Sequence, residues 1–222
     1  MELIETIKIE DGKIYNLKWH NQRCNRSRLE LFGCDAIRLE DYIKDYPPKG
    51  LFRCRVLYSE DIIKVEYIPY KKREFKSFKI VSSDIEYSYK YSNRDELDRL
   101  KEQNIQDSLE LECLHPKKTR LKPSVTNYLY DDIIIQKDGL LTDSTIANIA
   151  FFDGENWITP KKPLLRGTVR EKLLNQNFLI EKDINSDDLR HFCNFALMNA
   201  MIGFQIQKNI TIDIDKKERI CL

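Results

Sequence analysis

The sequence carries almost no excess charge of either sign, since 37 Lys and Arg residues face 36 Asp and Glu residues for a formal net charge of +1. No overall electrostatic field therefore favours nucleic acid or an anionic membrane, and any anion site has to be local. The chain also lacks an apolar run near the roughly 18 residues that a membrane span needs, and its first residues lack the layout of a signal peptide. We expect a soluble, cytoplasmic protein that binds neither nucleic acid nor membrane.

Paired cysteines and clustered histidines are missing as well. The six cysteines include no C-x-x-C pair, and the three histidines have no spacing typical of metal ligands. We therefore expect reduced structural thiols and no bound metal. The residues concerned are Cys24, Cys34, Cys54, Cys113, Cys193 and Cys221, and His20, His115 and His191.

The chain does contain enough apolar material for a large core, because 41% of its 222 residues are hydrophobic. Apolar and polar residues alternate over 3–9 and run into the turn dipeptide Asp11-Gly12, which predicts a β-hairpin. The other elements predicted in the first half are helices over 19–32 and 39–46 and strands over 52–57, 62–68 and 78–81. Together they indicate a mostly antiparallel sheet carrying helices, in an N-terminal α+β domain of residues 1–84.

The second half repeats this mixture of strands and helices. Its predicted elements are a strand over 85–90, a helix that follows the candidate N-cap Ser92, tight turns at Asp138-Gly139 and Asp153-Gly154 beside apolar strands, and a helix over 167–175. Residues 105–127 lack sustained periodicity, and we assign them to a loop-rich insertion. We predict a C-terminal domain of residues 85–222, and for the whole chain an α+β fold of two domains with antiparallel or mixed sheets.

Two segments, one at the start of each predicted domain, contain residues suited to binding a phosphate and attacking an aldehyde. His20 and Arg23 share one face of a predicted helix, and an arginine there could grip a phosphate through two charge-assisted hydrogen bonds. Lys90 lies where the predicted strand gives way to a helix, and a lysine in a partly dry pocket keeps a free amine. Taken singly, a solvated helix face and a surface lysine are the commoner roles for such residues.

Two segments of the second half supply an acid and a second phosphate site. Asp143, pointed at a pyridine nitrogen, would keep that nitrogen protonated, and the neighbouring Ser144 and Thr145 could offer hydroxyls and amides to a phosphate. The segment 163–171 places Gly167 before a capped helix, whose free amides suit a dianion. Each alone is more often a capped turn or a capped helix.

The order of these segments resembles that of the class IV aminotransferases, which are fold-type-IV enzymes dependent on pyridoxal phosphate, as in D-amino acid aminotransferases. The resemblance spans nearly the whole chain and rests on Leu3-Ile4-Glu5-Thr6-Ile7, Asp11-Gly12-Lys13, His20-x-x-Arg23, Lys90-x-x-Asn93-Arg94, Leu141-Thr142-Asp143-Ser144-Thr145-x-x-Asn148-Ile149, Thr159-Pro160 and Leu165-x-Gly167-x-x-Arg170. It implies that Lys90 carries the cofactor as a Schiff base and that Asp143 holds the pyridinium. It also implies that Arg23 binds the phosphate and that Gly167, Thr168 and Val169 close over it.

The sequence departs from the family pattern in several places. Asp143 stands where a glutamate is usual, and Val169 stands where a threonine is usual, so that a hydroxyl contact has to come from Thr168. The chain begins after the point where members have a preceding strand and a Gly-Asp-Gly turn. Lys117 and Lys118 of the insertion are fallback candidates for the cofactor lysine, but neither is followed by Asn-Arg at the family's spacing.

Several activities are compatible with these features. The resemblance favours 4-amino-4-deoxychorismate lyase slightly, in which pyruvate is eliminated to give p-aminobenzoate, and an aminotransferase of branched-chain or D-amino acids is the alternative. A non-catalytic binding module of the same fold is a third possibility, and a nucleic-acid-binding module is the weakest. The resemblance also implies a homodimer, to which Phe52, Tyr58 and Tyr67 are candidate contributors.

Overall fold

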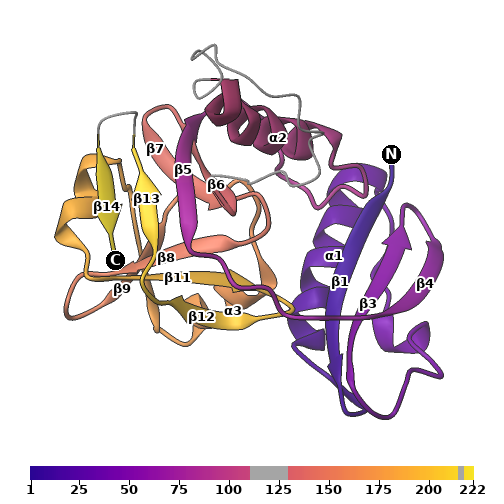
Figure 1. Cartoon of the computed structure of the whole chain (residues 1–222). Coiled ribbons are helices and arrows are strands. Elements are labelled where there is room, and N and C mark those ends of the chain that lie inside the picture. Colours follow the sequence, from indigo (N-terminus) through magenta and orange to yellow (C-terminus); the bar gives the residue numbers. More distant parts are fainter. Residues whose placement is uncertain (111–129, 215–217) are drawn as a thin grey trace, which may run out of the picture.

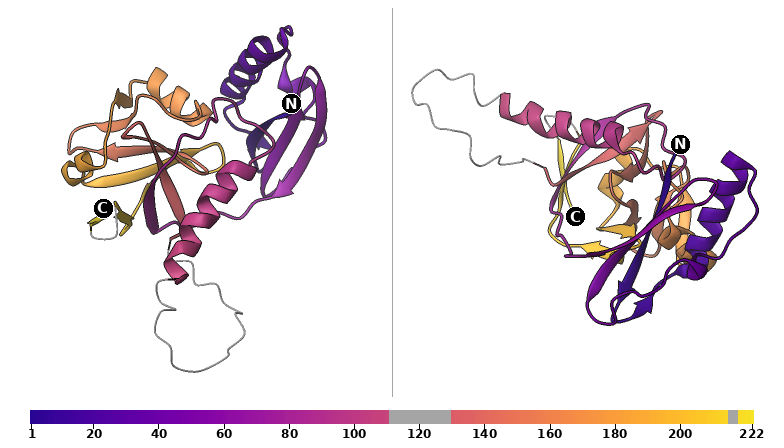
Figure 2. Two further views of the ribbon diagram at one scale, coloured as in Figure 1. Left: turned by 90° about the horizontal axis from the view of Figure 1, so that it is seen from above. Right: turned by 90° about the vertical axis from the view of Figure 1, so that its right-hand side faces the viewer.

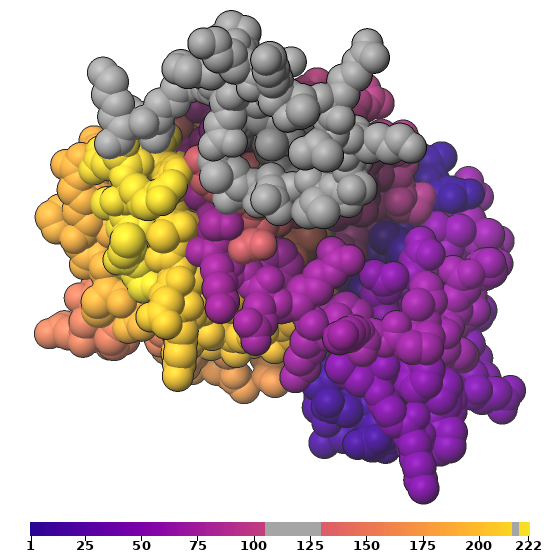
Figure 3. Space-filling model, in the orientation of Figure 1, coloured from indigo at the N-terminus to yellow at the C-terminus, as the bar shows by residue number. Residues whose placement is uncertain are grey.

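The computed structural model describes residues 1–110, 130–214 and 218–222, with the side chains of 105–110 left aside. Two sheets lie next to one another, and the chain passes from the first to the second between strands β4 and β5 (Figure 1). Two further views show helix α2 beside the larger sheet and helix α1 against the smaller one (Figure 2). In the space-filling view, the C-terminal strands and the strands of the first sheet occupy opposite ends of one face (Figure 3). Among the described residues, no helix is long and apolar enough to cross a membrane.

The first sheet has the strand order β2-β1-β3-β4. Its elements are β1 (Leu3–Glu10), β2 (Lys13–Ile14), α1 (Leu17–Phe32), the short 3-10 helix η1 (Leu39–Asp41), β3 (Leu51–Tyr58) and β4 (Ile62–Pro69). The antiparallel register sets Ile7 of β1 opposite Cys54 of β3, and both are fully buried in the core cluster that also contains Cys24 of α1. The predicted hairpin is confirmed, because Asp11 and Gly12 both adopt positive φ angles (48° and 72°), as a tight turn of this kind requires.

The two helix predictions of the first half have different outcomes. The helix predicted over 19–32 is confirmed by α1, which ends at Gly33 with a φ of 68° and a backbone N–H that donates to the carbonyls of Arg28 and Leu29. The helix predicted over 39–46 is wrong, because only the single turn η1 forms there. Asp45 takes a positive φ of 53°, a left-handed conformation that interrupts helical hydrogen bonding before the prolines that follow.

The second sheet has the order β10-β9-β8-β7-β6-β5-β13-β14, and β11 joins it against β8 with β12 beyond. Its strands are β5 (Ser77–Ser82), β6 (Asp132–Lys137), β7 (Leu140–Ser144), β8 (Asn148–Phe152), β9 (Trp157–Pro160), β10 (Leu179–Lys182), β11 (Asn194–Asn199), β12 (Gly203–Gln207), β13 (Thr211–Asp213) and β14 (Arg219–Cys221). A short 3-10 helix, η2 (Asp187–His191), precedes β11. The combination of helices with antiparallel and parallel pairs confirms the predicted α+β class.

Strand β5 corrects the predicted composition of the first sheet. Residues 78–81 do not join the N-terminal hairpin; β5 pairs in parallel with both β6 and β13 of the second sheet. Its Phe78 lies in the core of that sheet with Ile134 and Ile212, so the strand is buried there rather than against α1. The domain boundary at residues 84 and 85 stays a prediction, although the change of sheet occurs before it.

The segment before α2 also differs from expectation. Residues 85–90 form no strand, although the carbonyl of Lys90 accepts the N–H of Ile4 of β1 at 2.9 Å. Helix α2 (Asp95–Glu110) begins later than predicted, and Asn93, not Ser92, caps it by accepting the N–H of Asp95 at 2.7 Å. The helix extends into the predicted insertion 105–127, and the rest of that insertion, with Lys117 and Lys118, lies outside the described residues. Helix α3 (Thr168–Asn175) confirms the predicted helix over 167–175.

The core of the second sheet predicts a clear contrast between two phenylalanines. Phe195 is fully buried, and its ring centroid lies 5.2 Å from those of both Phe78 and Phe151. Phe195→Ala should lower the free energy of unfolding by about 3–5 kcal/mol, because it removes apolar contact and leaves a cavity. Phe178→Ala is the matched control, since Phe178 is 45% exposed and should cost much less. Equal losses in urea unfolding would contradict this account of the core.

Candidate active site

A buried carboxylate connects β1 with α1. Glu5 is fully buried, and its two oxygens accept hydrogen bonds from Arg23, from Nε at 2.8 Å and from a terminal nitrogen at 2.6 Å. His20 lies on the same face of α1, and its Nδ1 is 2.5 Å from Glu5 Oε2. The sequence placed His20 and Arg23 together correctly but assigned Glu5 no role. Arg23 is thus held in one position before any ligand arrives.

The charges of this triad are set by burial and by one another. Burial alone would raise the pKa of Glu5, but the charge of Arg23 and hydrogen bonds from His20 and Arg23 outweigh it and lower the pKa to about 2. Burial lowers the pKa of His20, although its contact with Glu5 opposes this. His20 is therefore the neutral donor to Glu5 through Nδ1, and its Nε2 is buried without a hydrogen-bond partner among the described residues.

Lys90 lies beside this triad, with its backbone fixed to β1 and its side chain partly buried. Burial lowers the pKa of its amine from 10.5 to about 7, and the positive charges of Arg23, Arg94 and Arg53 act in the same direction while Glu5 opposes them. A substantial fraction of Lys90 is consequently neutral near pH 7. A neutral amine is the nucleophilic form of lysine. The assignment of Lys90 as the cofactor lysine stays a prediction.

Asp143, in β7, is the buried acid of the second sheet. Its Oδ1 accepts a hydrogen bond from the side-chain amide of Asn148 at 2.7 Å, and its Oδ2 accepts the N–H of Leu165 at 2.9 Å. Burial raises the pKa of Asp143 to about 6, against the lowering effect of these two hydrogen bonds. The carboxylate is thus oriented by two donors and still mostly ionised at neutral pH.

The turn before α3 is attached to Asp143 through Asn148. The Asn148 amide also donates to the carbonyl of Leu165 at 2.8 Å, so one side chain links β8, the acid and the turn. Gly167 faces this amide closely: a Cβ at Gly167 would lie 2.0 Å from Asn148 Oδ1. Thr168 and Val169 follow as buried residues of the first turn of α3. The glycine is needed for close packing rather than for an unusual backbone angle.

A small cavity separates α1 from the start of α3. Its lining includes three arginines, Arg23, Arg26 and Arg166, together with Thr168. Arg23 and the turn before α3 therefore border one space. Of the three predicted residues of that turn, Thr168 lines the cavity, whereas Gly167 and Val169 do not. The remaining lining residues are Trp19, Gln22 and Glu171.

The hydroxyls of Ser144 and Thr145 have internal partners. Ser144 Oγ accepts the N–H groups of Ile146 at 3.3 Å and Ala147 at 3.2 Å, and Thr145 Oγ1 donates to Asp132 Oδ1 at 2.6 Å. Both side chains are buried. They shape the turn after Asp143, and a contact with phosphate stays a prediction.

A second cavity, larger than the one between α1 and α3, is not lined by Lys90, Asp143 or Arg23. Its lining comes from the segments that flank them: Glu86, Tyr87, Ser88, Lys137, Asp138, Leu140, Thr142, Lys162, Pro163 and Leu164. Among the described residues, no group of three or more His, Cys, Asp or Glu side chains could hold a metal ion.

Residues 2–210 match the family model of amino-transferase class IV. The chain belongs to this family. Class IV aminotransferases are pyridoxal-phosphate-dependent enzymes, as the sequence resemblance implied. An uncharacterized protein of Haemophilus influenzae is 34% identical over 207 residues, which cover 90% of this chain and 98% of that protein.

Solved structures of class IV aminotransferases agree with the fold. A crystal structure from Haemophilus somnus, described as a "putative 4-amino-4-deoxychorismate lyase", is 33% identical with a TM-score of 0.74, and the match covers 91% of this chain and 97% of that one. A hypothetical aminotransferase from Mycobacterium tuberculosis in its PLP-bound form is 14% identical with a TM-score of 0.68, over 96% of this chain and 81% of that one. The second likeness shows the fold alone.

The close approach of Gly167 to Asn148 predicts a non-additive pair of mutations. Gly167→Ala should destabilise this class IV aminotransferase by about 1–3 kcal/mol, because the backbone angles accept alanine but the new methyl group overlaps Asn148. In an Asn148→Ala background the same change should cost only a few tenths of a kcal/mol. Urea unfolding of the four proteins measures both costs, and equal costs would show that another contact limits residue 167.

The lowered pKa of Lys90 predicts a pH-dependent contribution to stability. Between about 7 and 10.5 the unfolded chain binds a proton at Lys90 that the folded chain has released, so stability should rise with pH through this window. Lys90→Met should lack this component. The check is urea unfolding of both proteins at intervals from pH 7 to pH 10.5. Parallel stability curves for wild type and Lys90→Met would contradict a lowered pKa at Lys90.

Proposed function

We propose that this protein is a pyridoxal-phosphate enzyme in which Lys90 holds the cofactor covalently. The observation that carries the proposal is the partly buried Lys90 amine beside Arg23, with a pKa lowered to about 7. Fold stability does not require a lysine in this environment, since burying an amine near three guanidinium groups is unfavourable. Asp143 and the α3 turn supply the two other groups that such a cofactor needs.

The residues present fit the cofactor by their chemistry. Arg23 is held and neutralised by Glu5, and the adjoining cavity adds Arg26 and Arg166 against one carboxylate, that of Glu171. A phosphate would therefore meet a net positive charge there. Thr168 adds a side-chain hydroxyl to this cavity, and the start of α3 adds free backbone N–H groups. The cavity thus combines the donor types that recognise a phosphate monoester.

Asp143 has the properties expected of the acid beside a pyridine nitrogen. Its carboxylate is buried and oriented by Asn148 and Leu165, so it would keep a proton on that nitrogen. When bound, pyridoxal phosphate would supply an electron-withdrawing ring that stabilises negative charge on the α-carbon of an amino substrate. Asp143 maintains that property by holding the ring proton.

Lys90 has a second role once its amine is free. Because its pKa lies near neutrality, Nζ can accept a proton from the substrate's α-carbon and return one to another atom at little energetic cost. Burial around Lys90 limits the access of water, which would otherwise compete for that proton. The choice of the atom that receives the proton decides between elimination and amino transfer.

We further propose 4-amino-4-deoxychorismate lyase as the leading activity, with release of pyruvate and p-aminobenzoate. Similarity over nearly the full length to the Haemophilus somnus protein described under that name supports this choice. Transamination of an amino acid of the branched-chain or D-amino acid type is the second candidate, supported by family membership. The two activities would use the same lysine and acid.

A cytoplasmic homodimer is also proposed, with sites near the subunit interface. The prediction that Tyr58 contributes to that interface is wrong, because Tyr58 is 1% exposed and belongs to the core of the first sheet. Phe52 and Tyr67 remain partly exposed on β3 and β4.

The direct test is removal of the proposed cofactor lysine. Lys90→Ala should lose the visible absorption band that wild type acquires with pyridoxal phosphate, together with borohydride-trapped label at residue 90 and all turnover. Lys162→Ala, at an exposed lysine nearby, is the matched control and should retain all three. Circular dichroism checks that both variants fold.

The same proteins distinguish the two activities. Wild type should form p-aminobenzoate and pyruvate from aminodeoxychorismate faster than it forms a keto acid from branched-chain or D-amino acids. The reverse order would favour the aminotransferase. Label that appears at Lys117 or Lys118 instead of Lys90 would overturn the site assignment.

A further inference from the structure

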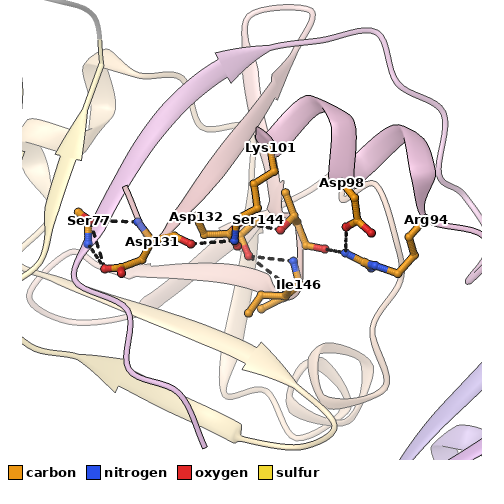
Figure 4. A network of polar contacts seen from close by, with 10 residues as sticks. Ser77, Arg94, Asp98, Lys101, Asp131, Asp132, Ser144 and Ile146 are labelled. Carbon is orange, nitrogen blue, oxygen red and sulfur yellow. Dashed lines mark hydrogen bonds and ion pairs between the residues drawn. The ribbon is translucent and has the colours of Figure 1, made fainter. Parts of the chain in front are cut away.

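A second buried carboxylate lies at the start of β6, away from Glu5. Asp132 is fully buried, and its Oδ1 accepts the hydroxyl of Thr145 at 2.6 Å and lies 3.2 Å from the ammonium of Lys101 (Figure 4). Lys101 also donates to the carbonyl of Asp131 at 2.8 Å. An isolated buried carboxylate would be strongly unfavourable, so Lys101 provides the compensating charge.

The same turn is also held from its backbone side. Arg94 donates to the carbonyl of Thr145 at 2.8 Å and lies 3.5 Å from Asp98. Arg94 directly precedes α2, and Lys101 lies within it about two helical turns further on. Both side chains therefore extend from the same side of the helix. Thr145 therefore has two links to this region: its carbonyl is bonded to Arg94, which directly precedes α2, and its hydroxyl is bonded to Asp132, which pairs with Lys101 of α2.

These contacts join the two segments that carry the proposed chemistry. Arg94 follows Lys90 closely in the chain, and Thr145 follows Asp143 closely. Lys90 comes from the first sheet's side, where its carbonyl is bonded to β1, whereas Asp143 belongs to β7 of the second sheet. The contacts of Asp132 with Thr145 and Lys101, together with the bond from Arg94 to Thr145, form the Asp132 network. Through this network α2 sets the position of the Lys90 segment relative to the Asp143 segment.

We propose that Asp132 is a positioning residue, which fixes Lys90 relative to Asp143 through Thr145, Lys101 and Arg94. The inference rests on the proposed function and deepens it, because it says what keeps the lysine and the acid in register. Asp132 touches neither of them. The turn after Asp143 is already closed by the Ser144 hydroxyl, so the pair of buried Asp132 with partly exposed Lys101 is not needed to form the turn.

The test distinguishes the effect of losing the hydrogen bond between Thr145 and Asp132 from the effect of a general loss of stability. Thr145→Val removes the hydroxyl at nearly constant volume, Thr145→Ser restores it, and Asp132→Asn removes the charge. Tyr130→Phe is the matched control: Tyr130 also donates a 2.6 Å hydrogen bond to a largely buried carboxylate, that of Asp213, but at the junction with β13. All variants are full-length chains. Each is measured at a temperature equally far below its own melting temperature, so that differences in stability do not affect the comparison.

The first readout needs no cofactor. It is the pH dependence of Lys90 acetylation by acetic anhydride, read from the peptide that contains Lys90. In Thr145→Val and Asp132→Asn the midpoint, which is the pH at half-maximal acetylation, should rise by about half a unit or more. A loosened α2 would admit water to Lys90 and let Arg94 move away, and both changes favour the protonated amine. Thr145→Ser and Tyr130→Phe should keep the wild-type midpoint.

The second readout is the dissociation constant of pyridoxal phosphate. It should rise roughly tenfold in Thr145→Val and Asp132→Asn, and stay within about twofold in Thr145→Ser and Tyr130→Phe. An unchanged Lys90 midpoint in Thr145→Val overturns the positioning role, whatever the cofactor affinity. If wild type binds no pyridoxal phosphate but the midpoint still moves, the proposed function fails while the control of Lys90 by Asp132 stands.

Discussion

The structure depends on the compensation of one buried charge. Glu5 occupies a core-facing position of β1, in phase with Leu3 and Ile7, where a carboxylate would cost several kcal/mol without partners. Arg23 and His20 of α1 supply those partners, so this contact ties the position of the helix to the sheet. This docking places a fixed guanidinium next to Lys90, and Lys90 is kept in its reactive form partly by that charge.

The proposed site divides its tasks between the two sheets. The first sheet and α1 provide positive charge through Arg23 and the attachment of Lys90 to β1. The second provides the acid Asp143 and the turn before α3, which Asn148 holds together. Two buried carboxylates, Glu5 and Asp132, hold these parts without taking part in the chemistry. Polar groups in the interior here define geometry, while the apolar clusters around them supply stability.

Local patterns in the sequence predicted local structure well. The Asp-Gly turns, α1 and α3 follow from residue preferences within a few positions. The segments proposed to carry the chemistry are indicated only by the resemblance of their order to that of the class IV aminotransferases. The sheet to which β5 belongs could not be predicted, because a short apolar strand contains no record of its partners. The alternation over 85–90 arises because Tyr87 and Tyr89 pack into different apolar clusters, not because the segment pairs as a strand. Glu5 was detectable as the charged residue that interrupts an apolar face, whereas the pairing of Asp132 with Thr145 arises only from tertiary folding.

The most direct measurement is a crystal structure of the protein soaked with pyridoxal phosphate. We expect electron density that is continuous from Lys90 Nζ to the cofactor, with the ring nitrogen facing the Asp143 carboxylate. The phosphate should lie between Arg23 and the turn formed by Gly167, Thr168 and Val169. Density joined to a different lysine, or a phosphate bound away from Arg23, would contradict the proposed site.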